Sequence, residues 1–526
     1  MSAKPKTSNY TDEQINEIIS TNAVLLGKVD SLQSQVDWFK RQIFGSKSEK
    51  LRYIDNPHQK DLDELFGENQ QAKSKDEGTE EVKGYQRRKK QDKSGTPDDS
   101  GLRFDENEVT VQEIEVPCPE LAGDDGDTYE VIGTKVTYRL AQKQSSYVVL
   151  KYIRKVIKHH PSKKIITPKA PANVLDKCQA DVSFLVGLLV DKFLYHQPLY
   201  RQHQRLQRSD IELSRTTLTN LVHRAIPLLK PIVDAQLKNI LRSHVLAMDE
   251  TPIKVGGKKK GKMHQAYYWP VYGDQDEMVF TYSASRASKH VREILGDFKG
   301  VLLADGYSAY EIYAKSNDNT TLAQCWSHSR RSFEKAKEKE PESVISALKI
   351  IARLYDKDQE IKPRWSDQKK LDHRAAHCSP IVDEFFQWCA EQLQRVDLLP
   401  SDKFAKALAY VSEREIALRE FLTDPAIQLD TNHIERGLRA IPMGRRAWLF
   451  CWTEVGAEYV GVIQSLIVTC RLHGINPSVY LTDVFLRIGD HPASRVEELT
   501  PRLWKETFAD QPLRSDLDLF GNNGSK

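Results

Sequence analysis

The chain has 526 residues and a mass of 60.2 kDa, enough for roughly three or four domains of ordinary size. A hydrophobic content of 39%, a charged content of 29% and a mean hydropathy of −0.56 exclude an integral membrane protein. The net charge of +3 neither requires nor excludes a nucleic-acid partner.

The N-terminal residues show no apolar core of a signal peptide, so we expect none. The seven cysteines are scattered, and no two of them form a CxxC pair. This pattern argues against a disulfide framework and favours a cytoplasmic location.

Residues 1–50 carry a heptad pattern typical of a coiled coil. Steps of four and three residues alternate along one stripe: Ile18, Asn22, Leu25, Val29, Leu32, Val36, Phe39 and Ile43. The stripe predicts a left-handed coiled coil and therefore a homo-oligomer, with an amphipathic helix packed on its own domain as the alternative. Residues 51–108 are predicted to be a charged linker, since half of residues 71–100 are charged.

A small β-rich module is predicted for residues 109–165, where β-branched residues gather in short runs. Residues 166–240 follow as a helical region. A helix ending near Leu206, a short turn, and a helix from the N-cap Ser214 to about Leu229 form the outline of a helix-turn-helix. An ordinary helical hairpin explains the pattern equally well. In the first interpretation, DNA is contacted by Arg215, Thr216, Thr217 and Asn220.

After residue 240 the pattern changes to short strands. Two of them, at 244–249 and 300–305, end in Asp249 and Asp305. We predict the order strand, strand, strand, helix, strand, with the acids on the first and fourth strands. In a ribonuclease-H-like sheet these two strands are neighbours, so both carboxylates would face one cleft. The alternative is that each aspartate merely ends a strand.

Carboxylates at the ends of buried strands are costly unless a cation offsets their charge. Oxygen ligands suit Mg²⁺ or Mn²⁺, and a pair of such ions can promote phosphoryl transfer. Side chains alternate along a strand, so Glu250 is expected to point away from the metal face.

A third acid is expected on a later helix, and Glu435 offers it. Basic residues near Glu435 suit DNA phosphates, although a surface salt-bridge cluster would look the same: Arg436, Arg439, Arg445 and Arg446. A helical insertion is predicted at 331–425, between the second and third acids. The CxxH formed by Cys325 and His328 lacks a partner pair nearby, so we expect it to have a packed structural role close to the site.

These segments, taken together, resemble the transposases of the insertion sequence 66 family. The segments that carry the resemblance are Ile43–Leu51, Pro198–Arg201, Leu213–Leu218, Met248–Pro252, Ala304–Tyr307, Cys325–His328, Asn432–Arg436 and Gly444–Phe450. The resemblance implies a DDE transposase, an enzyme that cuts the ends of its element and joins the 3′-hydroxyls to target DNA. It also implies accessory proteins from the same element.

By motif position, the resemblance makes Asp249, Asp305 and Glu435 the metal-binding triad. The implied fold is α/β, with a ribonuclease-H-like core at 241–330 and 426–475 and a C-terminal element at 476–526. Two alternatives remain, a non-catalytic DNA-binding protein derived from a transposase and a ribonuclease-H-type nuclease that cuts without joining.

One departure from the family concerns zinc. The family has a zinc-finger-like module after the linker, with two CxxC-type pairs. This chain keeps only Cys118, and His159 and His160 stand where the second pair would be. Two adjacent histidines and one cysteine make a poor tetrahedral set, so we expect no structural zinc.

Overall fold

The computed structural model describes residues 102–107, 109–122, 126–143, 146–256, 262–448 and 453–520. All of them belong to one unit that spans residues 95–526. The predicted coiled coil and all but the end of the predicted linker lie outside the described residues.

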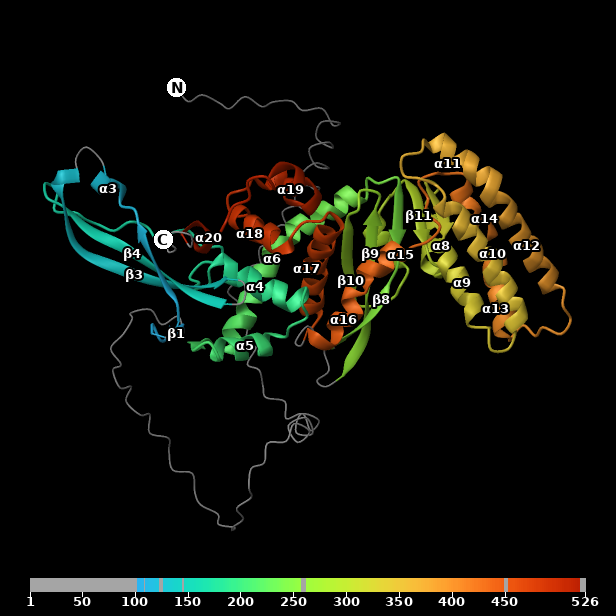
Figure 1. Ribbon diagram of the computed structural model, residues 1–526, viewed down its shortest axis with the longest axis horizontal. Helices are drawn as coiled ribbons and strands as arrows, with labels where there is room; N and C mark the ends of the chain where they lie inside the picture. The colour runs from blue at the N-terminus through green and yellow to red at the C-terminus, as the bar shows by residue number, and fades with distance from the viewer. Residues whose placement is uncertain are drawn as a thin grey trace, which may run out of the picture. The chain divides into compact units, whose positions relative to one another are not determined.

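The central sheet mixes parallel and antiparallel pairs in the order β10-β9-β7-β11-β12, with β8 paired to β9. β7, β11 and β12 are parallel, whereas β9 runs antiparallel to β7, β8 and β10 (Figure 1). The strands are β7 (Val245–Met248), β8 (Thr251–Gly256), β9 (Met263–Gly273), β10 (Met278–Ser283), β11 (Gly300–Ala304) and β12 (Thr320–Gln324).

The two strands that carry the aspartates are neighbours, as predicted. Val301–Leu303 of β11 pairs with Val245–Ala247 of β7 in parallel. Both strands are almost entirely buried, as expected when helices cover both faces of a sheet. Because the two strands are parallel, the residues that follow them reach the same sheet edge.

The predicted strand order missed one element. β8 begins just after Asp249 and Glu250, so Asp305 follows the fifth strand of the sheet and not the fourth. β8 contains Pro252, and among the described strands it pairs with β9 alone. An edge strand tolerates a proline that a central strand would not. Because proline lowers the strand propensity of this segment, the sequence pattern did not indicate β8.

Helix α17 (Glu454–Leu472) closes one edge of the sheet, beside β10 (Figure 1). The N–H groups of Phe280 and Met278 donate to Ser465 Oγ (2.9 Å) and Thr469 Oγ1 (3.1 Å) on this helix. A Cβ on Gly461 would lie 2.6 Å from the Phe280 carbonyl oxygen, so only glycine permits this approach. The helix thereby satisfies the donors that an edge strand leaves unpaired.

Among the described helices, α17 is the one long and apolar enough to cross a membrane. However, 72% of its apolar window is buried inside the protein. Its apolar surface is therefore accounted for by packing on the sheet.

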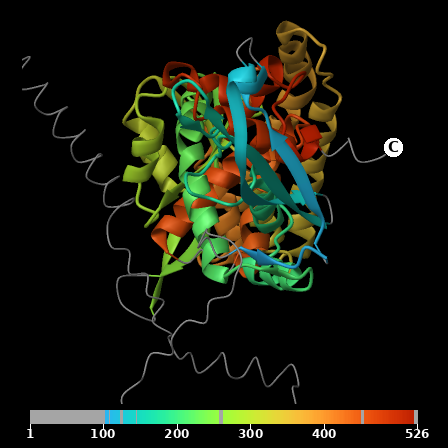
Figure 2. The same cartoon turned by 90° about the vertical axis from the view of Figure 1, so that its left-hand side faces the viewer.

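The expected β-rich region forms a four-stranded sheet of order β2-β4-β3, with β5 paired to β4. Figure 2 shows the long twisted hairpin of β3 and β4 facing the viewer. Cys118 Sγ contacts Glu120 (3.3 Å), and His159 Nδ1 contacts Ser162 Oγ (2.6 Å). The elements of this region are β2 (Val111–Val116), α3 (Pro119–Ala122), β3 (Tyr129–Lys143), β4 (Ser146–His159) and β5 (Ile165–Ile166).

The helical region that follows has a longer second helix than predicted. Ser214 caps it as expected, accepting from the N–H of Thr217 (3.0 Å), but the helix continues past Pro227 and Pro231 to Ile240. Each interior proline costs about 3 kcal/mol, which burial of apolar side chains at about 1.5–3 kcal/mol each can offset. The elements are α4 (Val182–Phe193), α5 (Leu199–Gln207), β6 (Ile211–Glu212), which pairs with β1 (Arg103–Phe104), and α6 (Arg215–Ile240).

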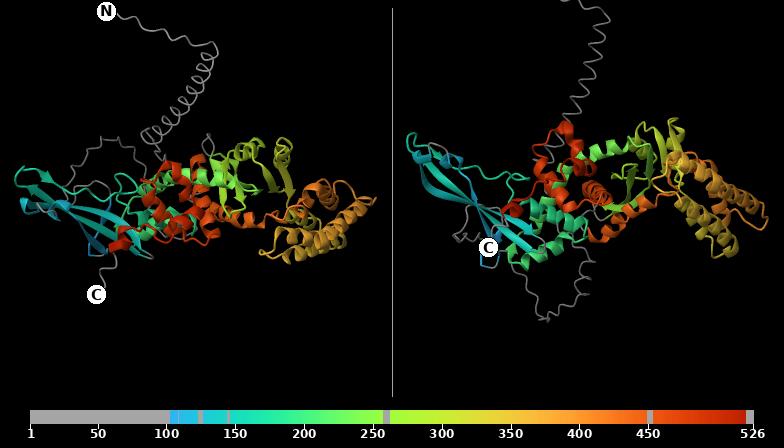
Figure 3. Two further views of the ribbon diagram at one scale, coloured as in Figure 1. Left: turned by 90° about the horizontal axis from the view of Figure 1, so that it is seen from above. Right: turned by 45° about the horizontal axis from the view of Figure 1, so that its top comes forward.

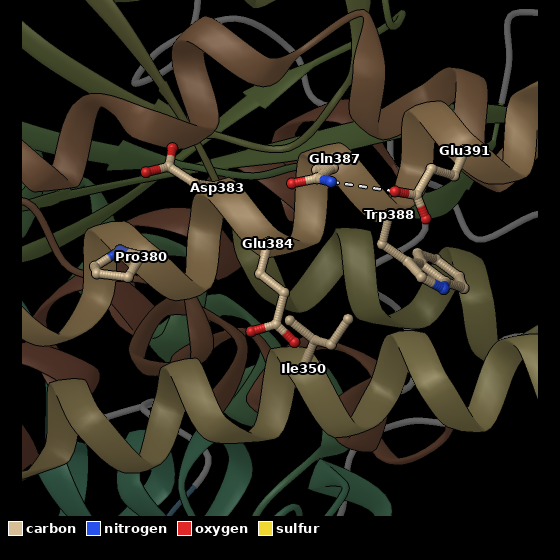
Figure 4. Close-up of a pocket in the computed structure, with 7 residues that line it drawn as sticks. All are labelled: Ile350, Pro380, Asp383, Glu384, Gln387, Trp388 and Glu391. Atoms are coloured by element: carbon tan, nitrogen blue, oxygen red, sulfur yellow. Dashed lines mark hydrogen bonds between the residues drawn. The ribbon is translucent and has the colours of Figure 1, made fainter.

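The region predicted to be a helical insertion is helical, and its helices gather beside the central sheet (Figure 3). A pocket of about 490 Å³ lies between α10 and α12, with Glu384, Trp388 and Glu391 among its lining residues (Figure 4). Its lining includes none of the predicted triad. The helices are α10 (Pro341–Gln359), α11 (Asp367–His373), α12 (Ser379–Leu393), α13 (Lys403–Ser412) and α14 (Glu415–Arg419).

The remaining helices connect or follow these parts. The helix predicted before the strand that leads to Asp305 is present as α7 (Lys289–Leu295). Tyr152 of β4 donates to Asp516 at the C-terminal end of the described chain (2.7 Å). The other helices are α8 (Ser308–Lys315), α9 (Trp326–Glu334), α15 (Asn432–Leu438), α16 (Ala440–Ala447), α18 (Pro477–Arg487), α19 (Pro501–Thr507) and α20 (Asp516–Phe520). None of the six described cysteines forms a disulfide.

Candidate active site

Three acids predicted from distant parts of the chain gather at one edge of the central sheet. Asp249 follows β7, Asp305 follows β11, and Glu435 lies on α15. The ligand atoms of Asp249, Glu250 and Asp305 lie within 4.8 Å of one another. Those of Asp249, His328 and Glu435 form a second group of the same size. Asp249 belongs to both groups and so connects the two.

Short turns hold the two aspartates after their strands. Asp249 Oδ1 accepts from the N–H of Glu250 (2.7 Å), and Asp305 Oδ1 accepts from the N–H of Tyr307 (2.9 Å). Such local bonds from an aspartate to a nearby N–H favour turns over continued strand. They fix each carboxylate at the point where its strand ends.

The third acid is held by contacts between its own segment and the end of β12. Thr431, which precedes α15, donates to Cys325 Sγ through both its N–H and its hydroxyl (3.3 Å each). The N–H of Trp326 donates to the Leu429 carbonyl (2.9 Å). Cys325 is fully buried. These bonds connect Glu435 to the same sheet edge as the aspartates.

Glu250 points into the acidic group, contrary to the prediction. Asp249 and Glu250 lie between β7 and β8, outside both strands, so the alternation of strand side chains does not apply to them. The Glu250 side chain is only 4% exposed. It accepts from the hydroxyl of Tyr310 (2.8 Å) and forms an ion pair with Arg286.

The electrostatics of the site resist full ionisation of the acids. Burial is the largest of the effects that together raise the pKa of Asp249 from 3.8 to about 7. The N–H of Glu250 opposes the rise, and the neighbouring carboxylates of Glu250, Asp305 and Glu435 add to it. Burial, followed by the charge of Asp305, also raises the pKa of Glu250. A divalent cation would reverse this balance, because it favours the ionised form of every carboxylate that it contacts.

Two arginines outside the predicted site flank the acids. Arg331 forms an ion pair with Glu435, and Arg286 pairs with Glu250 while lying 3.8 Å from the centre of the Tyr307 ring. Both arginine side chains are 42% exposed. Arg331 could have been found, since it follows His328 by three residues on one helix. No sequence signal indicated Arg286.

His328 lies inside the site and not merely near it. Burial lowers its pKa, the acids Asp305 and Glu435 raise it, and Arg331 lowers it. Its Nε2 lies 3.5 Å from Arg331 Nη1, and its buried Nδ1 has no hydrogen-bond partner among the described residues.

The predicted DNA-contacting residues at the start of α6 are mostly exposed. Arg215, Thr216 and Asn220 are exposed, whereas Thr217 is half-buried and bonded to Ser214. These residues belong to an element that carries none of the acids.

The basic residues that follow Glu435 differ among themselves. Arg436 and Arg439 are exposed, while Arg445 donates to the Pro252 carbonyl (3.0 Å) of β8. The side chain of Arg446 lies outside the described part of the chain.

The insertion contacts the loop that carries Asp305. A Cβ on Gly306 would lie 2.4 Å from the ring of Tyr410 on α13, and Arg414 donates to the Gly306 carbonyl (3.3 Å). A side chain at this position would therefore displace the ring of Tyr410, which packs the insertion against the site.

The residues present fit a divalent cation. The groups consist of carboxylate oxygens with one imidazole nitrogen, and their burial leaves charge that a cation would offset. Asp249, Asp305 and Glu435 supply an oxygen-rich set of the kind that Mg²⁺ and Mn²⁺ bind.

The chain is similar to proteins of Sinorhizobium fredii (strain NBRC 101917 / NGR234). It is 26% identical to "Uncharacterized protein y4hP" over 505 residues, which cover 91% of this chain and 89% of the relative. It is 30% identical to "Uncharacterized protein y4jD" over 357 residues, or 65% of this chain and 69% of the relative.

Three family models match successive parts of the sequence. "Transposase IS66 family" matches residues 177–459, "IS66 C-terminal element" matches 465–502, and "Transposase C of IS166 homeodomain" matches 31–99. The first model alone spans more than half of the 526 residues and includes every acid of the site. The chain therefore belongs to the IS66 family of transposases.

Proposed function

We propose that this chain is a metal-dependent DDE transposase, which cuts the DNA ends of an insertion sequence and joins the freed 3′-hydroxyls to target DNA. The observation that carries the proposal is the grouping of Asp249, Asp305 and Glu435 within two sets of ligand atoms that share Asp249. Membership of the IS66 transposase family supports DNA as the substrate, and the matched family model covers the three acids.

The strand order supports a ribonuclease-H-like core at 241–330 and 426–475. Two parallel neighbouring strands deliver the aspartates to one edge, and a helix after the insertion at 331–425 supplies the glutamate. Asp249, Asp305 and Glu435 would hold Mg²⁺ or Mn²⁺, which when bound would activate the attacking oxygen and stabilise the leaving oxygen. Arg286 and Arg331 would contact the phosphates on either side of the reacting bond.

DNA binding in this proposal uses two surfaces. The start of α6 offers Arg215, Thr216, Thr217 and Asn220 to the element end, as the second helix of a helix-turn-helix would. The segment after the third acid offers Arg436, Arg439, Arg445 and Arg446 to the phosphates near the reacting bond.

The predicted coiled coil at 1–50 would pair two copies of the chain, and thereby two element ends. We place the protein in the cytoplasm and expect accessory proteins of the same element to assist it.

A strand-transfer assay separates this proposal from its two rivals. The purified full chain, with Mg²⁺, a labelled element end and a target plasmid, should yield both cleaved ends and joined products. Cleavage without joining would indicate a nuclease. Binding without any DNA chemistry would indicate a non-catalytic DNA-binding protein.

A further inference from the structure

We propose that His328 is a nitrogen ligand of the metal site, which gives that site a preference for divalent transition ions such as Mn²⁺ over Mg²⁺ that carboxylates alone would not provide. The inference rests on the proposed function, because it concerns the composition of the same metal site. It differs from the structural role that the CxxH spacing suggested.

The fold brings His328 to the acids by a direct route. β12 runs parallel to β11, and α9 begins immediately after β12. The first turn of α9 therefore lies at the sheet edge where both aspartates follow their strands. His328 lies in that first turn, and one of its ring nitrogens is within 4.8 Å of carboxylate oxygens of Asp249 and Glu435.

The cysteine and the histidine of the CxxH motif have different roles in this arrangement. Cys325 contacts Thr431, and this contact holds the segment before Glu435. His328, three residues later, approaches Glu435 itself. One side chain thus positions the acid while the other completes the group around it.

The hydrogen bonding of His328 leaves a nitrogen for a ligand. Its contact with Arg331 is 3.5 Å long, which is at the limit for a hydrogen bond. Nδ1 is buried and has no partner among the described residues. An unpaired buried nitrogen is costly, and coordination of a cation is one way to satisfy it.

The ligand atoms of the site determine which cation it prefers. Mg²⁺ strongly prefers oxygen ligands, whereas an imidazole nitrogen suits transition ions. Mn²⁺ accepts carboxylates as Mg²⁺ does but tolerates an imidazole ligand better, so a site with Asp249, Glu435 and His328 should favour Mn²⁺ over Mg²⁺ more than an all-carboxylate site would.

Pulsed electron paramagnetic resonance of bound Mn²⁺ tests this without DNA or turnover. The full chain, stripped of metal and loaded with Mn²⁺, should show modulation from a directly coordinated imidazole ¹⁴N. His328→Gln should remove the modulation and weaken Mn²⁺ binding by roughly 10-fold or more, with a smaller effect on Mg²⁺. The matched control is His290→Gln, because both nitrogens of His290 already contact Ser285 and Glu293. This variant should behave as wild type.

Three results would overturn the inference. Wild type that binds Mn²⁺ without nitrogen coupling, or coupling that survives in His328→Gln, would assign His328 to orienting Arg331 and leave the proposed function intact. If the wild-type chain binds no more Mn²⁺ than Asp249→Asn, a variant that lacks one of the proposed ligands, then there is no metal site. That result would also contradict the proposed metal dependence.

Discussion

Asp249 shows how burial of an acid opposes stability. Burial raises the pKa of Asp249 to about 7 in the folded protein, whereas the unfolded chain releases this proton near 3.8. Between these values the folded state holds more protons than the unfolded state, so stability falls as the pH rises from about 4 to 7. At higher pH the full cost, on the order of a few kcal/mol, is present.

Asp249→Asn removes that cost, so in EDTA it should raise the melting temperature at pH 8 and raise it less at pH 5. A gain of 1 kcal/mol corresponds to about 2–4 °C in a domain of this class. Added Mg²⁺ should stabilise wild type and not the variant. Thermal melts at the two pH values measure both effects. A variant less stable than wild type at pH 8 without metal would contradict the account.

Glu250 should matter to the chemistry, because its carboxylate lies within the group formed by Asp249 and Asp305. Glu250→Gln should lower strand transfer by roughly 10- to 100-fold, as loss of a ligand or of its direct support does. The matched control is Glu311→Gln, since Glu311 is exposed and its ion pair within the described part of the chain is with Lys315 on its own helix. Equal activity of the two variants would place Glu250 outside the chemistry.

At the scale of elements, apolar runs predicted β7 and β11 well, because a strand buried on both faces needs a continuous apolar sequence. β8 was missed because its proline is tolerated only at an edge. The position of Glu250 was predicted wrongly because side chains alternate between faces only within a strand, and Glu250 lies beyond the end of β7. The length of α6 depends on tertiary burial that offsets two prolines, which local sequence does not reveal.

The start of α6 carries a prediction about recognition. If it reads the element end, Asn220→Ala should weaken binding to that end by about 1–3 kcal/mol and change binding to random DNA much less. Arg215→Ala should weaken both equally and reduce the salt dependence, as loss of a phosphate contact does. Fluorescence anisotropy on the two DNAs measures this. If Asn220→Ala weakens binding to the element end and to random DNA equally, Asn220 contacts the DNA backbone and not a base.

At the scale of the whole molecule, periodicity could not place Glu435 beside the aspartates. A helical insertion separates them in sequence, and the family resemblance supplied the match. The structure supplies the physical connection through the buried Arg374 of the insertion. Its guanidinium bonds Asp358 and donates to three carbonyls of the segment that leads back to Glu435, those of Phe421, Asp424 and Ile427.

The predicted coiled coil bears on assembly. Deletion of residues 1–50 should reduce the mass in solution from a dimer or larger to a monomer, because the apolar stripe would be lost. It should also impair pairing of two element ends while single-end binding remains. Light scattering and a paired-end gel assay measure the two properties. An unchanged oligomer after the deletion would assign self-association to another surface.

The measurement that tests the central claim most directly is strand transfer by three variants that keep shape and remove charge: Asp249→Asn, Asp305→Asn and Glu435→Gln. Each should abolish cleavage and joining with Mg²⁺ or Mn²⁺, since the acids act in the chemical step. Circular dichroism and end binding should stay close to wild type, because other elements carry the fold and the recognition. Any one of the three variants that retains near-wild-type strand transfer would contradict the assignment of the triad.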